Sequence, residues 1–246
     1  MITEIDPTRI RWHGEGFAIY DIADFLPHHP NYPHGTNSID PNTGKRSVAG
    51  SYSNIPNRKI TTIVCHQTAG GYGAANKQVF ETASFFVRDP AFKPNPRFNQ
   101  DLPAGLKNMR FLWTGTGRGW PGFAYTWFVP FKPIIWVDPD TDIELYLIYQ
   151  CNDLNTISWH TGDHQNDIGG GIAFQGYFLE PDAGIIHPMK GTDGSPSEAQ
   201  LQIYEGFWSA YAQPVLGATI LTIHAEHGKP SCPGQVLREK TLELRS

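Results

Sequence analysis

The sequence has 246 residues, of which 39% are hydrophobic and 17% charged, and its formal net charge is −5 at pH 7. A chain of this length accommodates one sizeable core, so a single domain with elaborations is favoured over two domains. The basic residues are scattered rather than gathered into a patch, which argues against a nucleic-acid partner. No apolar run approaches the roughly 18 residues that cross a bilayer, so no membrane span is expected.

The N-terminal segment MITEIDPTRIRWHGEG has early acidic residues, no basic start and no apolar core, so it does not match a secretory signal peptide. We therefore expect synthesis in the cytoplasm. The three cysteines, Cys65, Cys151 and Cys232, are an odd number in a chain without an export signal. A disulfide framework is disfavoured on that ground, and a thiolate ligand or buried thiols are the better interpretations.

Turn-forming residues occur nearly throughout residues 1–59. This composition predicts a long irregular N-terminal arm, with at most short strands, packed on a domain that spans residues 60–246. The run from Ile60 to His66 is β-branched and apolar, which predicts a buried strand. Apolar residues at helical spacing predict a helix over residues 74–87. Residues 89–122 are rich in Pro, Gly and Asn and are expected to form an inserted loop region.

Five further strands are predicted from apolar and β-branched runs, over residues 124–129, 134–137, 145–150, 171–178 and 219–223. The sequence Ser195-Pro196-Ser197-Glu198 matches a capping box with Pro at the first helical position, and the helix it opens is expected to end before Pro214. A last short helix is predicted over residues 236–244. Because strands and helices interleave, we expect an α/β (α+β) fold with a single mixed central β-sheet flanked by helices.

Two histidines stand at the ends of β-branched strands, His66 after the first strand and His224 after the run 219–223. Cys232 follows His224 in a segment whose Pro and Gly residues force a loop, which can return the sulfur toward the histidine. Two imidazoles and a thiolate fill three corners of a zinc tetrahedron and leave the fourth open, as a catalytic site requires. From the residues alone, satisfied core histidines stay an equal alternative, and His227 is an alternative ligand.

Four segments then appear in order: IVCHQTA (63–69), YTWFV (125–129), WHTG with NDIGGGI (159–162 and 166–172), and HAEHGKPSCPG (224–234). Together they resemble the zinc amidase family that includes phage T7 lysozyme, the second type of bacterial N-acetylmuramoyl-L-alanine amidase and the animal peptidoglycan recognition proteins. The resemblance covers about residues 60–246, with large insertions, and leaves the N-terminal arm outside.

The resemblance implies that Zn2+ is bound by His66, His224 and Cys232. It makes Tyr125 the first candidate for the catalytic donor to the oxyanion, with Lys229 or His160 second. Substrate-binding residues are expected at Gln67, Thr68, Trp159, Thr161 and Asn166.

The sequence departs from the family pattern at two positions. Ala173 stands where many bacterial relatives have a catalytic Glu, so the acid–base mechanism of that branch is not available. Pro230 stands where the family often has Lys or Thr, and Lys229 lies one residue earlier. We therefore expect Lys229 to contribute less than Tyr125.

The implied activity is hydrolysis of the amide bond between N-acetylmuramic acid and the L-alanine of the stem peptide. The substrate is peptidoglycan or a muropeptide, and a monomer is favoured. A cell-wall-lytic enzyme of the phage or prophage endolysin type would reach the wall through lysis or a holin. The alternatives are a cytoplasmic amidase that recycles soluble muropeptides and a binding module without catalysis. Cys232 argues against the binding module, because non-catalytic relatives typically lack the thiolate ligand.

Overall fold

The computed structural model describes residues 5–23, 55–68, 124–132, 134–158, 160–161, 165–185 and 193–246. Its strands are β1 (Ile10–Gly14), β2 (Phe17–Asp21), β3 (Thr62–Gln67), β4 (Trp127–Val129), β5 (Ile134–Val137), β6 (Glu144–Gln150), β7 (Gly169–Phe174) and β8 (Ile220–Ile223). Its longer helices are α4 (Glu198–Gly206), which continues as the π-helical η5 (Phe207–Ala212), and α5 (Gln235–Arg245). Shorter helical segments are η1 (Pro7–Arg9), α3 (Gln165–Ile168), η4 (Pro181–Ala183) and η6 (His224–His227).

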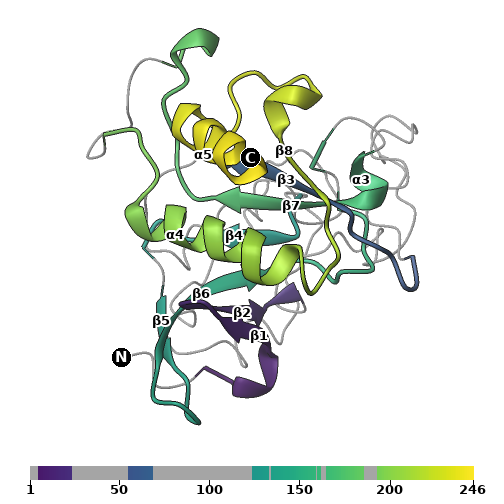
Figure 1. The fold of residues 1–246 in the computed structure, drawn as a ribbon, viewed down its shortest axis with the longest axis vertical. Coiled ribbons are helices and arrows are strands. Elements are labelled where there is room, and N and C mark those ends of the chain that lie inside the picture. The colour runs from purple at the N-terminus through teal and green to yellow at the C-terminus, as the bar shows by residue number, and fades with distance from the viewer. Residues whose placement is uncertain are drawn as a thin grey trace, which may run out of the picture.

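These strands form one mixed sheet in the order β1-β2-β6-β4-β7-β3-β8, and β5 pairs with β6. Neighbours among β4, β7, β3 and β8 run parallel, whereas β6 is antiparallel to β4. Helices α4 and α5 lie across one face of this sheet (Figure 1). The predicted fold class, a single mixed sheet with helices packed against it, is confirmed.

The two faces of β3 serve different purposes. Every residue of β3 and β7 is buried, as is usual for parallel strands in the middle of a sheet. Because side chains alternate along a strand, Ile63 and Cys65 enter the hydrophobic core with residues of α4, η5 and α5. His66 therefore points to the face opposite those helices. Cys65 is fully buried in this core, as expected for an apolar filler.

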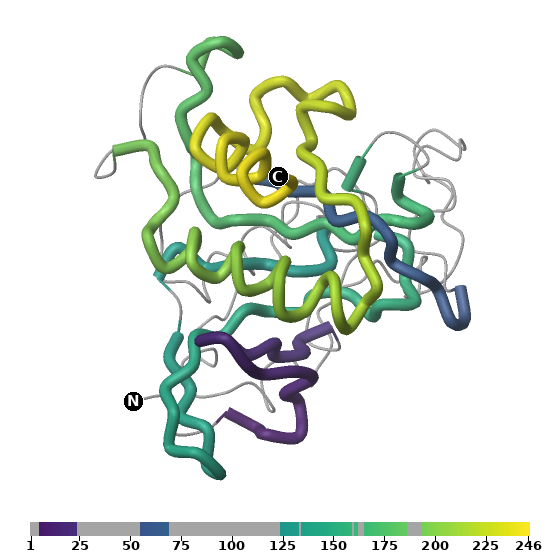
Figure 2. The backbone as a smooth tube through the Cα atoms, in the orientation of Figure 1, coloured from purple at the N-terminus to yellow at the C-terminus, as the bar shows by residue number. Residues whose placement is uncertain are grey.

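The N-terminal region supplies two strands to the sheet. Both are short, as predicted, but they belong to the sheet rather than lying on it: β2 is buried throughout and pairs in parallel with β6. The reason is the continuous apolar run Phe17–Tyr20, which the surrounding turn residues obscure in the sequence. The tube in Figure 2 shows this purple hairpin beside the teal β6. The domain boundary at residue 59 stays a prediction.

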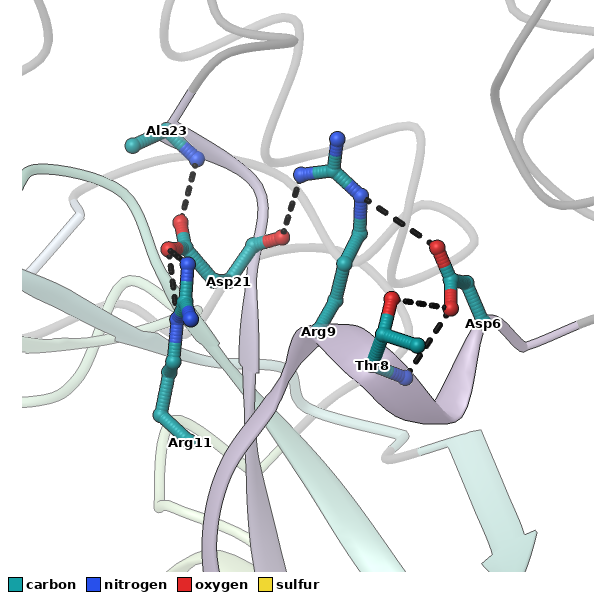
Figure 3. A network of polar contacts seen from close by, with 6 residues as sticks. All are labelled: Asp6, Thr8, Arg9, Arg11, Asp21 and Ala23. Carbon is teal, nitrogen blue, oxygen red and sulfur yellow. Dashed lines mark hydrogen bonds and ion pairs between the residues drawn. The ribbon is translucent and has the colours of Figure 1, made fainter.

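A polar network fixes the end of β2 to the start of the chain (Figure 3). The Asp21 carboxylate accepts two hydrogen bonds from Arg11, at 2.9 and 2.7 Å, and one from the backbone N–H of Ala23 at 2.9 Å. Arg9 donates to the Asp21 carbonyl at 3.3 Å and forms an ion pair with Asp6 at 3.9 Å. These contacts order the hairpin at the sheet edge.

The capping box of α4 is present, but the predicted position is wrong by two residues. Ser197, not Ser195, is the N-cap: its hydroxyl accepts from the Gln200 N–H at 3.2 Å, and the Gln200 side chain accepts from the Ser197 N–H at 3.1 Å. The buried Gln200 amide also donates to the carbonyls of Val129 and Gln175, both at 3.1 Å. These contacts with the ends of β4 and β7 select the start of the helix.

The other predicted elements agree with the structure to within a few residues. Strand β7 begins and ends earlier than the predicted 171–178, and β4 is shorter than 124–129. The predicted helix over residues 74–87 and the predicted insertion 89–122 lie outside the described residues. No helix within the described ranges is long and apolar enough to cross a membrane.

The close approach of Trp127 to Gly170 makes a stability prediction. A Cβ at Gly170 would lie 2.4 Å from the Trp127 ring, so Gly170→Ala overpacks the core and should cost about 1–3 kcal/mol of unfolding free energy. Gly16→Ala is the comparison, because it has open space and only the strain of φ +81°, which costs about 1 kcal/mol. Urea unfolding of both variants measures the difference. Wild-type stability in Gly170→Ala would contradict the packing argument.

Candidate metal centre

The register between β3 and β8 brings two histidines together. In this parallel pair Cys65 lies opposite Ile223, so the next residue of each strand, His66 and His224, leaves the same edge of the sheet side by side. Their Nδ1 atoms are 3.0 Å apart and their ring centroids 4.5 Å apart. His66 is fully buried and His224 is partly exposed.

The loop after η6 returns Cys232 to the same point. Gly228 ends η6 in the left-handed conformation, with φ +84°, and turns the chain back. The Cys232 Sγ then lies 3.9 Å from His66 Nδ1. One ligand atom each from His66, His224 and Cys232 lies within 4.8 Å of the other two. The structure thus brings the three predicted ligands together.

Gln67 anchors the Cys232 loop to β3. Its backbone N–H donates to Cys232 Sγ at 3.3 Å, and its side-chain amide donates to the Ser231 carbonyl at 2.5 Å. The other end of the same amide accepts from the Phe178 N–H at 2.6 Å. Gln67 is buried, and the contacts that the structure gives it are with the protein. A direct contact of Gln67 with substrate stays a prediction.

Backbone contacts and one arginine hold the rest of the loop. The Lys229 N–H donates to the His224 carbonyl at 3.2 Å, and the Lys229 carbonyl accepts from the Cys232 N–H at 2.9 Å. Arg238 of α5 donates to the Pro230 carbonyl at 3.0 Å. The Lys229 side chain is exposed, so the contacts of this residue with His224 and Cys232 are made by its backbone.

A second cluster fixes η6, which carries His224. The guanidinium of Arg245 donates to both carboxylate oxygens of Glu226, at 2.8 and 2.7 Å, and to the Leu221 carbonyl at 2.6 Å. Thr222 donates to Glu226 and lies 3.3 Å from His227 Nε2. Within the described residues, His227 is not part of the ligand group, so it does not replace one of the three predicted ligands here.

The donor set fits Zn2+. Zinc–nitrogen bonds of about 2.0–2.1 Å in a tetrahedron place two ligating nitrogens about 3.3 Å apart, close to the observed 3.0 Å. Burial, followed by the nearby imidazoles, holds the pKa of His66 well below its ordinary value, so the ring is neutral, as a ligand must be. Burial also raises the pKa of the Cys232 thiol to about 12. Cys232 is therefore a thiolate at neutral pH only when a cation stabilises it.

His160 lies on the far side of the His66 ring from the ligand group. Its Nδ1 is 3.3 Å from His66 Nε2, and its Nε2 is 3.2 Å from the Gly169 carbonyl. The ring is 4% exposed, and burial lowers its pKa to about 3. A Cβ at Gly171 would lie 2.9 Å from this ring, so the glycine leaves room for it.

Tyr125 lies against the ring of His66. The two ring centroids are 4.9 Å apart, and Tyr125 is partly exposed. Its carbonyl accepts from the Asn152 side chain at 2.7 Å, which fixes the chain just before β4. Ala173 is directly opposite His66 in the β3–β7 pairing, so the position where many amidases of the resembled family have Glu lies beside His66 and carries only a methyl group.

The remaining predicted substrate residues are found in two places. Thr68 is partly exposed, and its hydroxyl accepts from the Gly176 N–H at 3.1 Å. Thr161 and Asn166 are buried and bind one another, with the Asn166 amide donating to the Thr161 carbonyl at 2.8 Å. Trp159 lies outside the described residues. Contact of these residues with substrate stays a prediction.

Arg58 was missed by the sequence reasoning. Its guanidinium donates to five backbone carbonyls, those of Leu154, Thr156, Asn166, Asp167 and Gly169. In the sequence, Arg58 stands beside Lys59 at the end of a turn-rich segment, where it looks like an ordinary solvated side chain. No sequence signal identifies it, because all five acceptors lie about a hundred residues away.

No family model and no curated protein matches this chain. Among solved structures it is similar to the N-acetylmuramoyl-L-alanine amidase endolysin LysCS from Clostridium intestinale, with 16% identity, 76% of this chain and 84% of that chain covered, and a TM-score of 0.44. It is also similar to the Ph2119 endolysin from a Thermus scotoductus bacteriophage, with 20% identity, coverage of 78% and 88%, and a TM-score of 0.40. A third is Drosophila peptidoglycan recognition protein SD, with 13% identity, coverage of 91% and 92%, and a TM-score of 0.48.

These three are of the kinds that the sequence resemblance names: amidases, endolysins and peptidoglycan recognition proteins.

The Glu226–Arg245 pair predicts a pH-dependent contribution to stability. Hydrogen bonding to Arg245 lowers the pKa of Glu226 to about 2, from 4.5 in its ordinary state. Because the folded pKa is the lower one, the stabilisation is present above pH 4.5 and is lost as the pH falls toward 2. Glu226 is 42% exposed, so we expect Glu226→Gln to cost less than about 1 kcal/mol at pH 7.

Urea unfolding of metal-free wild type and Glu226→Gln between pH 7 and pH 2.5 would test this. The difference in unfolding free energy should shrink below pH 4.5. A difference that stays constant across this range would exclude ionised Glu226 as its source.

Proposed function

We propose that this chain is a zinc-dependent amidase that hydrolyses the bond between N-acetylmuramic acid and the L-alanine of the peptidoglycan stem peptide. The observation that supports the proposal most is the convergence of two imidazole nitrogens and a thiol within 4.8 Å, at the carboxyl edge of parallel strands. The choice of this bond is supported by the four family-like segments, since three ligands alone fit many zinc hydrolases.

An amide is a poor electrophile, and water is a poor nucleophile at neutral pH. Bound Zn2+ would supply the Lewis acidity that activates both. His66 and His224 are the neutral donors in this proposal, and Cys232 contributes the single negative charge. That set leaves a net charge of about +1 at the site, which preserves the Lewis acidity.

Tyr125 is the proposed donor to the oxygen on which negative charge develops. Its ring packs against the proposed ligand His66, with the ring centroids 4.9 Å apart, which supports this assignment. Ala173 offers no carboxylate next to His66, which is why the proposal assigns no general base there. The remaining groove contacts are assigned to Thr68, Trp159, Thr161 and Asn166, with Gln67 acting mainly through the Cys232 loop.

The alternatives differ in substrate or in the absence of turnover. Loss of turbidity of purified cell walls supports a wall-lytic endolysin-type enzyme, and turnover of soluble muropeptides alone supports a recycling amidase. Binding of walls without turnover by zinc-loaded protein supports a recognition module. Mass spectrometry of the digested peptidoglycan identifies the bond that is cut, and a product set without free stem peptides would contradict the proposal.

The metal assignment predicts about one zinc per chain in the purified protein. His66→Ala, His224→Ala and Cys232→Ala should each lose metal and activity together, because each removes one of three ligands. His227→Ala is the matched control and should retain zinc, since His227 lies outside the ligand group. Metal analysis and an activity assay measure both effects. Full metal content in Cys232→Ala would remove Cys232 from the ligand set.

The donor assignment predicts that Tyr125→Phe keeps zinc and fold but loses about 10²-fold or more in kcat, because only a transition-state interaction is removed. Lys229→Ala should lower the rate by only about tenfold, about 1.4 kcal/mol. The Lys229 side chain is exposed, and Pro230 occupies the position where the resembled family often has Lys or Thr. Near-normal turnover by Tyr125→Phe would move the donor role elsewhere.

A further inference from the structure

We infer that His160 is a positioning residue for His66, and that it keeps the proton of the His66 ring on Nε2 so that Nδ1 is free to bind the metal. This inference rests on the proposed metal site. It differs from the role of oxyanion donor that the sequence first suggests for His160.

The Gly169 carbonyl oxygen determines the direction of the hydrogen bonds that join it to His160 and join His160 to His66. The Gly169 carbonyl can only accept, so the His160 Nε2 at 3.2 Å must carry the proton. The Nδ1 of a neutral His160 is then an acceptor, and the His66 Nε2 at 3.3 Å must donate to it. His66 Nδ1 is left with a lone pair. That lone pair lies on the side of His224 and Cys232, where the ligand group is.

The Gly169 carbonyl is itself held in place. Arg58 donates to it from Nη2, and the same nitrogen donates to the Asn166 carbonyl at 2.8 Å. The other guanidinium nitrogens donate to Thr156 at 2.8 Å and to Asp167 at 3.0 Å. A carbonyl has two lone pairs, so Gly169 accepts from both Arg58 and His160. Arg58 therefore fixes the Gly169 carbonyl, the acceptor that determines the direction of the hydrogen bonds from His160 to Gly169 and from His66 to His160.

The backbone and ring of His160 are fixed as well. The Asn166 side-chain oxygen accepts from the His160 N–H at 3.0 Å and from the Thr161 N–H at 2.9 Å. The His160 ring packs over Gly171, where a Cβ would collide with it. Both of its nitrogens face protein groups, and the ring is almost completely buried. No N–H of this ring is left to donate to a substrate oxygen.

Outer groups that bind the second nitrogen of a ligating histidine orient the ring and raise its basicity, and their loss typically costs 10- to 100-fold in metal affinity. Two substitutions of equal size separate this role from packing. His160→Leu removes the acceptor, whereas His160→Asn places an amide oxygen where Nδ1 stood. We expect His160→Leu to weaken zinc binding about 10- to 100-fold and His160→Asn to recover most of the loss.

Zinc affinity is measured by competition with a chelator, and unfolding of the metal-free variants shows whether they are folded. His227→Leu is the control, and it should bind zinc as wild type does because His227 is outside the ligand group. Wild-type affinity in His160→Leu, or equal losses in His160→Leu and His160→Asn, would overturn the inference and leave the proposed amidase standing. A wild-type protein that binds no zinc would overturn both.

A measurement on the unsubstituted protein does not depend on how any variant folds. Nitrogen-15 NMR of metal-free wild type should show His66 protonated at Nε2, with a slowly exchanging, hydrogen-bonded ring proton. His66 protonated at Nδ1 would overturn the inference whatever the zinc affinities are.

Discussion

The candidate metal centre depends on one constraint, the register of β3 between β7 and β8. With Cys65 opposite both Ile172 and Ile223, His66 lies next to Ala173 on one side and to His224 on the other. A shift of one residue would turn His66 toward the helices and put Cys65 on the opposite face. The buried apolar residues on the core face hold this register, because a one-residue slip would turn them away from the core.

Two consecutive glycines show how one strand serves both faces. Gly170 leaves space for the Trp127 ring in the hydrophobic core, and Gly171 leaves space for the His160 ring behind the predicted ligand His66. Since side chains alternate along a strand, neighbouring positions necessarily serve opposite faces. A methyl group on either residue would press on a large buried ring, so β7 couples the packing of the core to the placement of the histidines. Stability and site geometry are therefore not independent in this sheet.

Much of this arrangement is predictable from the sequence, because β-branched runs and turn residues are local signals. They place His66 and His224 at strand ends and Cys232 in a returning loop, and the structure brings all three together. The features that the sequence does not reveal depend on contacts between residues that are far apart in the chain. Helix α4 begins two residues after its predicted start because Gln200 binds the ends of two strands. Arg58 looks like a surface residue until its five carbonyl acceptors, distant in sequence, are known.

Protein contacts hold each of the three predicted ligands in place. His66 belongs to the buried sheet, the Arg245–Glu226 pair fixes the helical turn of His224, and Gln67 binds the loop of Cys232. In small zinc domains the metal's binding free energy is also the folding free energy, because no site exists in the unfolded chain. Here the hydrophobic core contains none of the three predicted ligands. An ion held by these residues would have little ordering left to accomplish, so its binding free energy would be available for affinity and for keeping the Cys232 thiol ionised.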